Sequence, residues 1–400
     1  MKKSGFGFWL GFLSVILFAT SVNAATFTVT NTNDTGAGSL RQAITSANGT
    51  AAIDTIEFDI PGSGVKTIAP LTVLPTITQP LIIDGTTQTG WSVGNLVIEI
   101  DGSNLSGTTA RGLSFNSIPT SAAQSFVRGL IINRFLGAGI YIETASNITI
   151  EGCILGTDAT TVEDRGNARG IDLNAGGILE NIIIGGNTAA ERNIISGNSL
   201  GINTSGGDNI VITGNYIGTN KTGTIALPNS SGIQMLSSFC TIGGATAAEG
   251  NVISGNTNVG IILSNSQNTV SNNFIGTAAD GITPLGNGSS GMRLINAFNS
   301  STGGRHLISN NIIANNSRQG ISFFPSFIPT IGNNISTNSI YNNGVVFLPQ
   351  NLGIDLDNDF ITPNDAGDAD SGTNNLQNFP VLTSATVATT TTNILGTLNS

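Results

Sequence analysis

A glycine followed by an apolar side chain recurs through most of this chain at intervals of 27 to 33 residues, which limits the folds it can adopt. These glycines are Gly112, Gly139, Gly170, Gly201, Gly232, Gly260, Gly291, Gly320 and Gly353. A repeat of this length is typical of proteins in which one short structural unit stacks on the next. The repeat therefore predicts a solenoid.

The residues after each glycine alternate as a β-strand requires. The first and third positions are mostly apolar, as in Ile171 and Leu173, and the second is mostly polar, as in Asp172. Because neighbouring side chains of a strand point to opposite faces, we expect the first and third columns inside and the second outside. The outward column comprises Ser114, Tyr141, Asp172, Asn203, Gln234, Ile262, Arg293, Ser322 and Asp355.

Further strand-like segments fill each repeat, as at residues 181–186 and 193–198. They predict three short strands per turn, joined by Gly and Asn, which accept positive φ better than other residues. Strands that stack once per turn are parallel, and such crossovers are right-handed in nearly all proteins. The predicted fold class is all-β, a right-handed parallel β-helix with a small N-terminal cap containing a short helix. We also expect Asn198, Asn215 and Asn256 to hydrogen-bond from coil to coil.

Composition and charge exclude several classes of protein. The chain of 400 residues contains 52 Gly and only 10% charged residues, which disfavours a long helical protein. The formal net charge of −10 gives no electrostatic support for a nucleic-acid partner. The single histidine, His306, excludes a mechanism that needs two, and it is expected at the surface beside Arg305.

The first 24 residues have the pattern of a secretory signal peptide. Lys2 and Lys3 precede an apolar stretch, and a small-residue cleavage pattern ends at Ala24. We therefore expect an exported protein, secreted or at the cell surface, with no membrane insertion of the mature chain. Cys153 and Cys240 are expected to be small, semi-buried residues rather than a disulfide pair.

Three regions follow the predicted signal peptide. Residues 25–100 are expected to form an N-terminal capping region, in which Ser39 and Gln42 flank the start of a helix from Leu40 to about Asn48. Leu40, Ala43, Ile44 and Ala47 would share its apolar face. Residues 101–375 are assigned to the β-helix. Residues 376–400 are interpreted as the start of a C-terminal β-sandwich-like domain or a linker, truncated at Ser400.

Over residues 100 to 375, the Gly-Ile strands and Gly-Asn turns resemble right-handed parallel β-helix proteins of the pectate-lyase-like type. Residues 26–44 resemble the CSLREA-type N-terminal module of exported bacterial β-helix proteins, with Gly38 in place of the Cys and Gln42 in place of the Glu. The first resemblance implies a β-helix, on which lyases use calcium-binding carboxylates with an Arg or Lys base on the outside of a coil.

Two groups of residues are candidates for a site. The loop from Asp158 to Asp172 also contains Arg165 and Arg169, which supplies the ingredients of a lyase site or of a surface salt-bridge cluster. In the outward column, Asp172 is followed by the uncharged residues Asn203 and Gln234. A substrate groove would need several carboxylates there, so the sequence favours the salt-bridge interpretation.

The second group is acidic and lies near the C-terminus. It comprises Asp365, Asp368, Asp370 and Asn374, with a glycine at position 372. Calcium takes six to eight oxygen ligands from such side chains, so calcium is the cofactor that the sequence allows. The alternative is a solvated acidic loop.

These observations predict a secreted or cell-surface β-helix scaffold, adhesive or glycan-binding, with no recognisable catalytic site. Its expected partner is an extracellular glycan or a surface protein. The alternative is an extracellular polysaccharide lyase or glycoside hydrolase, which the resemblance permits without establishing it.

Overall fold

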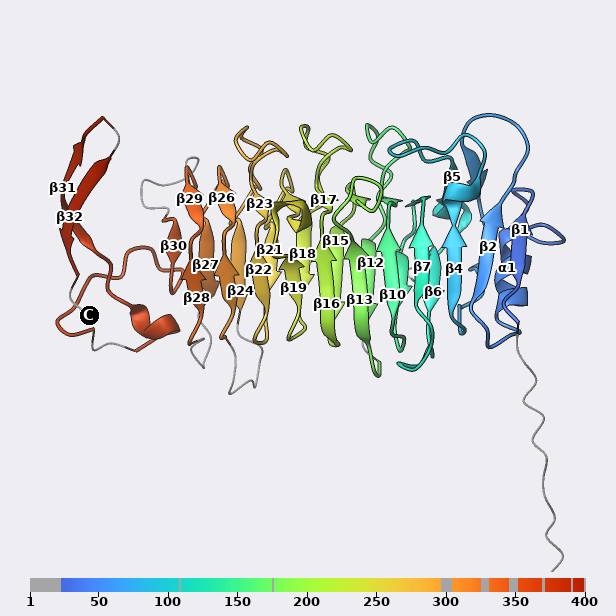
Figure 1. Ribbon diagram of the computed structural model, residues 1–400, viewed down its shortest axis with the longest axis horizontal. Coiled ribbons are helices and arrows are strands. Elements are labelled where there is room, and N and C mark those ends of the chain that lie inside the picture. Colours follow the sequence, from blue (N-terminus) through green and yellow to red (C-terminus); the bar gives the residue numbers. More distant parts are fainter. Residues whose placement is uncertain are drawn as a thin grey trace, which may run out of the picture.

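The computed structural model describes residues 23–107, 109–174, 176–295, 304–324, 331–344, 352–368, 371–389 and 391–398. The predicted signal peptide lies almost entirely outside these residues. The chain winds into a parallel β-solenoid in which three sheets run the length of the molecule (Figure 1). The predicted fold class, an all-β parallel β-helix with three strands per coil, is confirmed.

Sheet A contains 11 parallel strands. They are β1 (Thr26–Val29), β2 (Asp54–Phe58), β4 (Leu81–Asp84), β7 (Ser125–Arg128), β10 (Ile148–Glu151), β13 (Glu180–Gly185), β16 (Asp208–Thr213), β19 (Thr241–Gly243), β22 (Thr269–Ser271), β25 (Leu307–Ser309) and β28 (Asn334–Ser336).

Sheet B contains 10 strands, and most of them are very short. They are β3 (Lys66–Ile68), β5 (Ile98–Asp101), β8 (Leu130–Asn133), β11 (Ile154–Leu155), β14 (Ile194–Ile195), β17 (Tyr216–Ile217), β20 (Val252–Ile253), β23 (Phe274–Ile275), β26 (Ile312–Ala314) and β29 (Ser339–Tyr341).

Sheet C contains the nine Gly-Ile strands of the repeat. They are β6 (Leu113–Phe115), β9 (Ala138–Ile142), β12 (Arg169–Asn174), β15 (Leu200–Ser205), β18 (Ser231–Met235), β21 (Ile261–Leu263), β24 (Met292–Ile295), β27 (Ile321–Phe324) and β30 (Ile354–Asp355).

The predicted register of sheet C is confirmed residue by residue. Ile171 pairs with Ile202, and Ile202 pairs with Ile233. All three side chains are fully buried in the single core that runs through the stack. The predicted outward column is continuous from Ser114 to Asp355.

The helix α1 (Leu40–Ala47) covers the N-terminal end of the stack beside β1 and β2 (Figure 1). The Ser39 side chain accepts a hydrogen bond from the backbone N–H of Gln42 at 3.2 Å and so caps the helix. The four apolar residues predicted to share one face, Leu40, Ala43, Ile44 and Ala47, are the four buried residues of the helix. Strands β1 to β5 belong to sheets A and B, so residues 25–100 also contribute the first coils of the solenoid.

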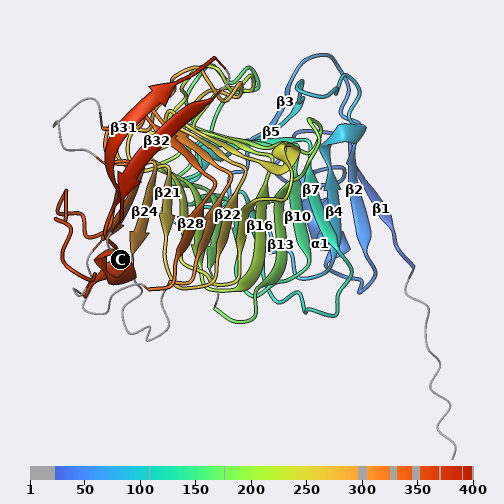
Figure 2. The ribbon, with the colours of Figure 1, turned by 60° about the vertical axis from the view of Figure 1, so that its left-hand side comes forward.

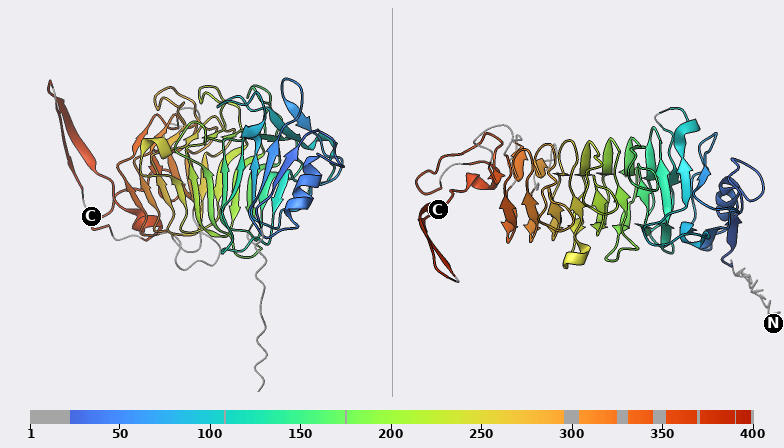
Figure 3. Two further views of the ribbon diagram at one scale, coloured as in Figure 1. Left: turned by 45° about the vertical axis from the view of Figure 1, so that its right-hand side comes forward. Right: turned by 90° about the horizontal axis from the view of Figure 1, so that it is seen from above.

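The last coil ends at a cavity of about 480 Å³, which Ile335, Ile354, Phe360 and Phe379 help to line. Beyond it, β31 (Val381–Val387) and β32 (Thr392–Thr397) form an antiparallel hairpin, seen at the C-terminal end in Figures 2 and 3. Short 3₁₀ turns complete the structure at Gly85–Thr87 (η1), Gly102–Asn104 (η2), Ala247–Glu249 (η3) and Thr373–Leu376 (η4).

The expected coil-to-coil bonding of asparagines is confirmed, and the three predicted residues divide between two ladders. Between sheets A and B, the amides of Asn193, Asn215, Asn251, Asn273, Asn311 and Asn338 bond in series. Between sheets B and C, the series is Asn167, Asn198, Asn229, Asn256, Asn287, Asn316 and Asn343. Asn215 therefore belongs to a different corner from Asn198 and Asn256.

The expectation that His306 lies at the surface is wrong. The residue is 2% exposed, in a third ladder between sheets C and A. His306 Nδ1 accepts a hydrogen bond from the N–H of Asn268 at 3.3 Å, and the N–H of His306 bonds to Asn333 Oδ1 at 3.1 Å. The imidazole thus occupies a position at which the neighbouring coils place an asparagine.

Candidate functional site

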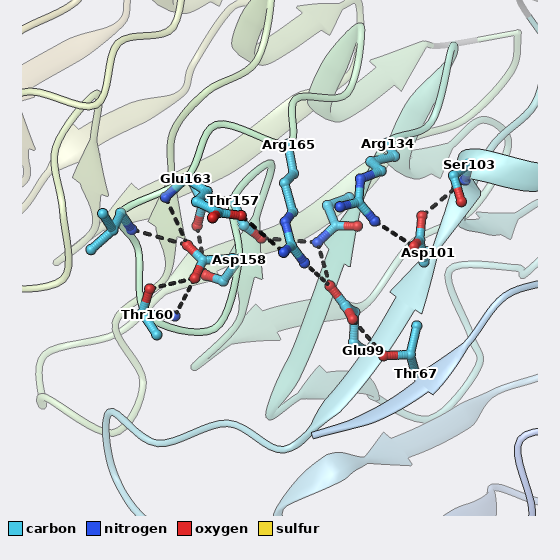
Figure 4. A network of polar contacts seen from close by, with 12 residues as sticks. Thr67, Glu99, Asp101, Ser103, Arg134, Thr157, Asp158, Thr160, Glu163 and Arg165 are labelled. Atoms are coloured by element: carbon cyan, nitrogen blue, oxygen red, sulfur yellow. Dashed lines mark hydrogen bonds and ion pairs between the residues drawn. The ribbon is translucent and has the colours of Figure 1, made fainter. Parts of the chain in front are cut away.

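Glu99 is the centre of a polar network on the outer face of sheet B (Figure 4). Its carboxylate accepts hydrogen bonds from Thr67 Oγ1 at 2.7 Å and from Asn133 Nδ2 at 2.8 Å. Arg165 Nη1 pairs with the same carboxylate at 3.1 Å. The side chain of Glu99 is only 6% exposed. Its negative charge is compensated by Arg165, and both of its oxygens accept hydrogen bonds.

Arg165 follows the loop of residues 157–164 and bridges two carboxylates. Its Nη2 lies 3.0 Å from Glu163, in addition to the contact with Glu99. Burial disfavours the charged guanidinium, but Glu163 and Glu99 outweigh this effect and raise the pKa of Arg165. The arginine therefore stays protonated, which suits an ion pair better than a catalytic base.

Asp158 shapes the same loop. Its carboxylate accepts hydrogen bonds from the backbone N–H groups of Val162 at 3.0 Å and Glu163 at 2.9 Å, and also from Thr160. Burial alone would raise the pKa of Asp158, but these hydrogen bonds outweigh it and lower the pKa to about 2. Asn220, at the equivalent place in the next loop of this type, accepts hydrogen bonds from the backbone N–H groups of Thr224 and Ile225 in the same way.

An ion pair beside the network was not predicted from the sequence. Arg134 Nη1 lies 2.5 Å from Asp101 Oδ2, while Asp101 Oδ1 caps the short turn η2 through the N–H of Ser103. Glu99 was missed as well. Both carboxylates alternate with buried Ile98 and Ile100 in β5, and this period-2 pattern was the signal that could have revealed them.

Arg169 and Asp172 lie on a different face, the outer side of sheet C. Arg169 Nη1 is 3.3 Å from Asp172 Oδ2, and Asn203 Nδ2 donates to Asp172 Oδ1 at 2.7 Å. The four residues of the predicted loop site are thus divided between two faces, with Asp158 and Arg165 at the rim of sheet B. Arg165, Arg169 and Asp172 form ion pairs, whereas Asp158 is hydrogen-bonded to groups of its own loop.

The outer face of sheet C carries stacked planar polar groups. The guanidinium carbon of Arg111 lies 3.2 Å from the centre of the Tyr141 ring, and Asn174 donates to the Tyr141 hydroxyl at 3.2 Å. Tyr141, Asp172, Asn203 and Gln234 occupy one register position in four successive coils. Parallel strands are about 4.8 Å apart, so this face repeats hydrogen-bonding groups at that interval.

The predicted calcium ligands lie in the segment that follows the last coil. Asp368 Oδ1 accepts from the N–H of Asn378 at 2.7 Å, and Asn374 Oδ1 accepts from the N–H of Asn333 at 3.1 Å. Asn374 therefore extends the ladder that contains His306. Asp370 lies outside the described residues. Within the part of the chain that is described, no group of three His, Cys, Asp or Glu residues is placed to hold a metal ion.

Both cysteines are buried, unpaired thiols, which agrees with the prediction that they form no disulfide. Burial raises the pKa of Cys153 and of Cys240 to about 12, so neither is set up as a nucleophile. Among the helices of the described residues, none is both long enough and apolar enough to cross a bilayer.

No family model matches this sequence, and no curated protein matches it. Two solved structures are similar, at 15% identity and a TM-score of 0.33 each. The Dettilon tailspike protein matches over 91% of this chain and 73% of its own. The A-module of the Azotobacter vinelandii mannuronan C-5 epimerase matches over 85% of this chain and 100% of its own. At that TM-score, neither similarity transfers a residue role or an activity to this protein.

Proposed function

We propose that this protein is a secreted or cell-surface β-helical scaffold that binds glycans along the outer face of sheet C without cleaving them. The observation that carries the proposal is the polar column from Tyr141 to Gln234, beside which Arg169 and Asn174 are exposed and Gln234 is half-buried, while the Tyr141 ring is covered by Arg111. Guanidinium and amide groups match the hydroxyls of a sugar chain, and solenoids suit extended ligands. The proposed export rests on the sequence of residues 1–24.

The carboxylates of the two regions described above, Asp172 beside the sheet C column and Glu99 in the network on sheet B, support a binding role over a hydrolytic one. Glycoside hydrolysis needs two carboxyl groups that face the substrate with different protonation states. Asp172 is 6% exposed, and its carboxylate is bound by Arg169 and Asn203. Glu99 is likewise paired with Arg165. These groups stabilise neighbouring coils.

A glycan array with a matched cleavage assay tests the proposal. Wild-type protein should bind one class of glycan, and Arg169→Gln should weaken that binding at least fivefold because Arg169 is an exposed cation at the edge of the column. Arg305→Gln removes an exposed charge from the turn that leads into sheet A and should have no effect.

The same polysaccharides should yield no unsaturated products or new reducing ends, with or without calcium. Turnover that Arg165→Ala or Asp172→Ala abolishes would replace the scaffold with the lyase or hydrolase alternative. Absence of binding to any glycan, or equal binding by wild type and Arg169→Gln, would contradict the role of sheet C.

A further inference from the structure

A small cleft opens on the outer side of sheet B, away from the face of sheet C considered above. It has a volume of about 140 Å³ and lies between the segment that carries Trp91 and Leu96 and the turn that carries Arg192. Ile154 of β11 and Ile194 of β14 form its apolar floor, and Lys221 completes the lining from the next large loop. Four segments distant in the sequence therefore converge on it.

The two cations of the cleft have no acidic partner among the residues that the structure describes. Arg192 Nε donates to the carbonyl of Gly214 at 3.1 Å, and its guanidinium carbon lies 4.2 Å from the centre of the Tyr216 ring. Lys221 Nζ donates to the carbonyl of Gly94 at 3.2 Å. Of the described residues, five arginines form ion pairs, whereas no carboxylate of the described chain lies within ion-pair distance of Arg192 or Lys221. Two such cations in one cleft are notable in a chain of net charge −10.

Trp91 also lines the cleft and carries an unpartnered donor. Its indole Nε1 is buried and has no hydrogen-bond partner among the residues that the structure describes. An indole N–H can only donate, and a buried donor without an acceptor destabilises the folded protein. The neighbouring acid, Glu191, is engaged in its own turn, where it accepts from the N–H of Thr188 at 3.0 Å.

We propose that this cleft binds the acidic group of an anionic sugar, a uronic acid or a sulfated residue. Three donors and an apolar floor match a ligand with a compact oxyanion next to an apolar ring face, because the indole and guanidinium bond to the anion while the ring packs on Ile154 and Ile194. A nucleic acid fits poorly, because binding its backbone takes cations along several phosphates, whereas this cleft is small and holds two.

Calorimetric titration tests this site with three probes: trigalacturonate, its methyl ester, and galactose 6-sulfate. Trigalacturonate, the sulfated sugar or both should bind, and the neutral ester should bind at least tenfold more weakly than whichever acidic probe binds. Which acidic probe binds identifies carboxylate or sulfate as the source of the anion. Equal binding of the ester, or no binding of either acidic probe, would overturn the proposal.

Three substitutions assign the binding to this cleft. Trp91→Phe removes the N–H and keeps an aromatic ring, and it should weaken binding of the acidic probe about fivefold. Arg192→Gln and Lys221→Met should each weaken it about tenfold. Arg318→Gln removes an exposed charge at the other end of the stack and should leave affinity unchanged. If Arg318→Gln lowers affinity as much as Arg192→Gln does, the attraction is non-specific and the cleft is not the site.

Arg169→Gln separates this inference from the function proposed for sheet C. It should weaken glycan binding on the array and leave the affinity for the acidic probe unchanged. Loss of probe binding in Arg192→Gln with an unaltered array result would support the cleft alone, and a melting temperature equal to that of wild type would show that each variant is folded.

Discussion

At the scale of single residues, the repeating glycine is required by close approach between coils. A Cβ at any of the eight glycines from Gly112 to Gly320 would lie only 2.4–2.9 Å from the carbonyl oxygen of the next glycine in the column. The backbones of successive coils are close at these glycines, which lie beside the asparagine ladder between sheets B and C. The glycine that marks the repeat in the sequence is thus a packing requirement.

We expect Gly201→Ala to destabilise the protein by about 2 kcal/mol or more, because the new methyl group would lie 2.5 Å from the carbonyl oxygen of Gly232. Gly353→Ala is the matched control. Gly353 ends the same column of glycines. A methyl group added there would lie nearest to the Ile340 side chain, at 3.3 Å. Urea unfolding of both variants measures the difference, and equal losses would show that the column does not need glycine.

The residues of the candidate site were partly predictable. Arg165 and Asp172 stood out because charged residues are rare in this chain. Their partners did not, because Glu99 lies 66 positions before Arg165 and reaches it only when one coil stacks on another. Linear spacing within a coil carries no information about which coils meet at a loop.

At the scale of elements, the polar ladders hold the corners of the coil. In the ladder between sheets A and B, Asn251 Nδ2 donates to Asn273 Oδ1 at 2.9 Å and to the carbonyl of Ile212 at 2.8 Å. These amides are buried, so leaving one unpaired would cost about 1–3 kcal/mol. A buried histidine in such a ladder makes it sensitive to pH.

We expect His306→Asn to remove a pH dependence of stability between about pH 6.5 and pH 4. Burial lowers the pKa of His306 from 6.5 to about 4. Below pH 6.5 the histidine is protonated in the unfolded chain but stays neutral in the folded chain until about pH 4. The free energy of unfolding of the wild type therefore falls as the pH falls through this window. The loss for this group is at most about 3 kcal/mol.

Urea unfolding of both proteins at several pH values measures this effect. Their difference isolates His306, because every other titrating group is common to both. Asparagine suits the position, since Asn268 and Asn333 occupy it in the neighbouring coils. Two stability curves that stay parallel from pH 7 to pH 4 would show that the histidine does not titrate in this way.

At the scale of the whole molecule, the two ends of the stack are closed differently. The amphipathic helix α1 covers the N-terminal coil, and the sequence predicted it because a cap residue and four apolar positions are encoded locally. At the other end, the segment around Phe360 and Phe379 leaves a cavity above the last coil. The acidic residues predicted to bind calcium belong to this segment.

If Asp365, Asp368 and Asp370 hold calcium, the ion should stabilise the C-terminal end. Calcium titrated into chelator-treated protein should release heat and raise the melting temperature, and about 2.7 kcal/mol is expected at a hundredfold excess over the dissociation constant. Asp368→Asn should reduce both effects, while Asp280→Asn, in an exposed loop of the solenoid, should not. A titration without heat and an unchanged melting temperature would leave the acidic segment as a solvated loop.

The sequence by itself determined the coil of this protein: its length, its three strands, and which side chains face inward. These properties depend on neighbouring residues, because strand alternation and turn-forming Gly and Asn act over a few positions. Only the tertiary structure decided that His306 is buried, that Asp158 and Asp172 lie on separate faces, and that Trp91, Arg192 and Lys221 meet. Stacking sets those distances, since side chains from different coils approach one another only after the whole solenoid has wound.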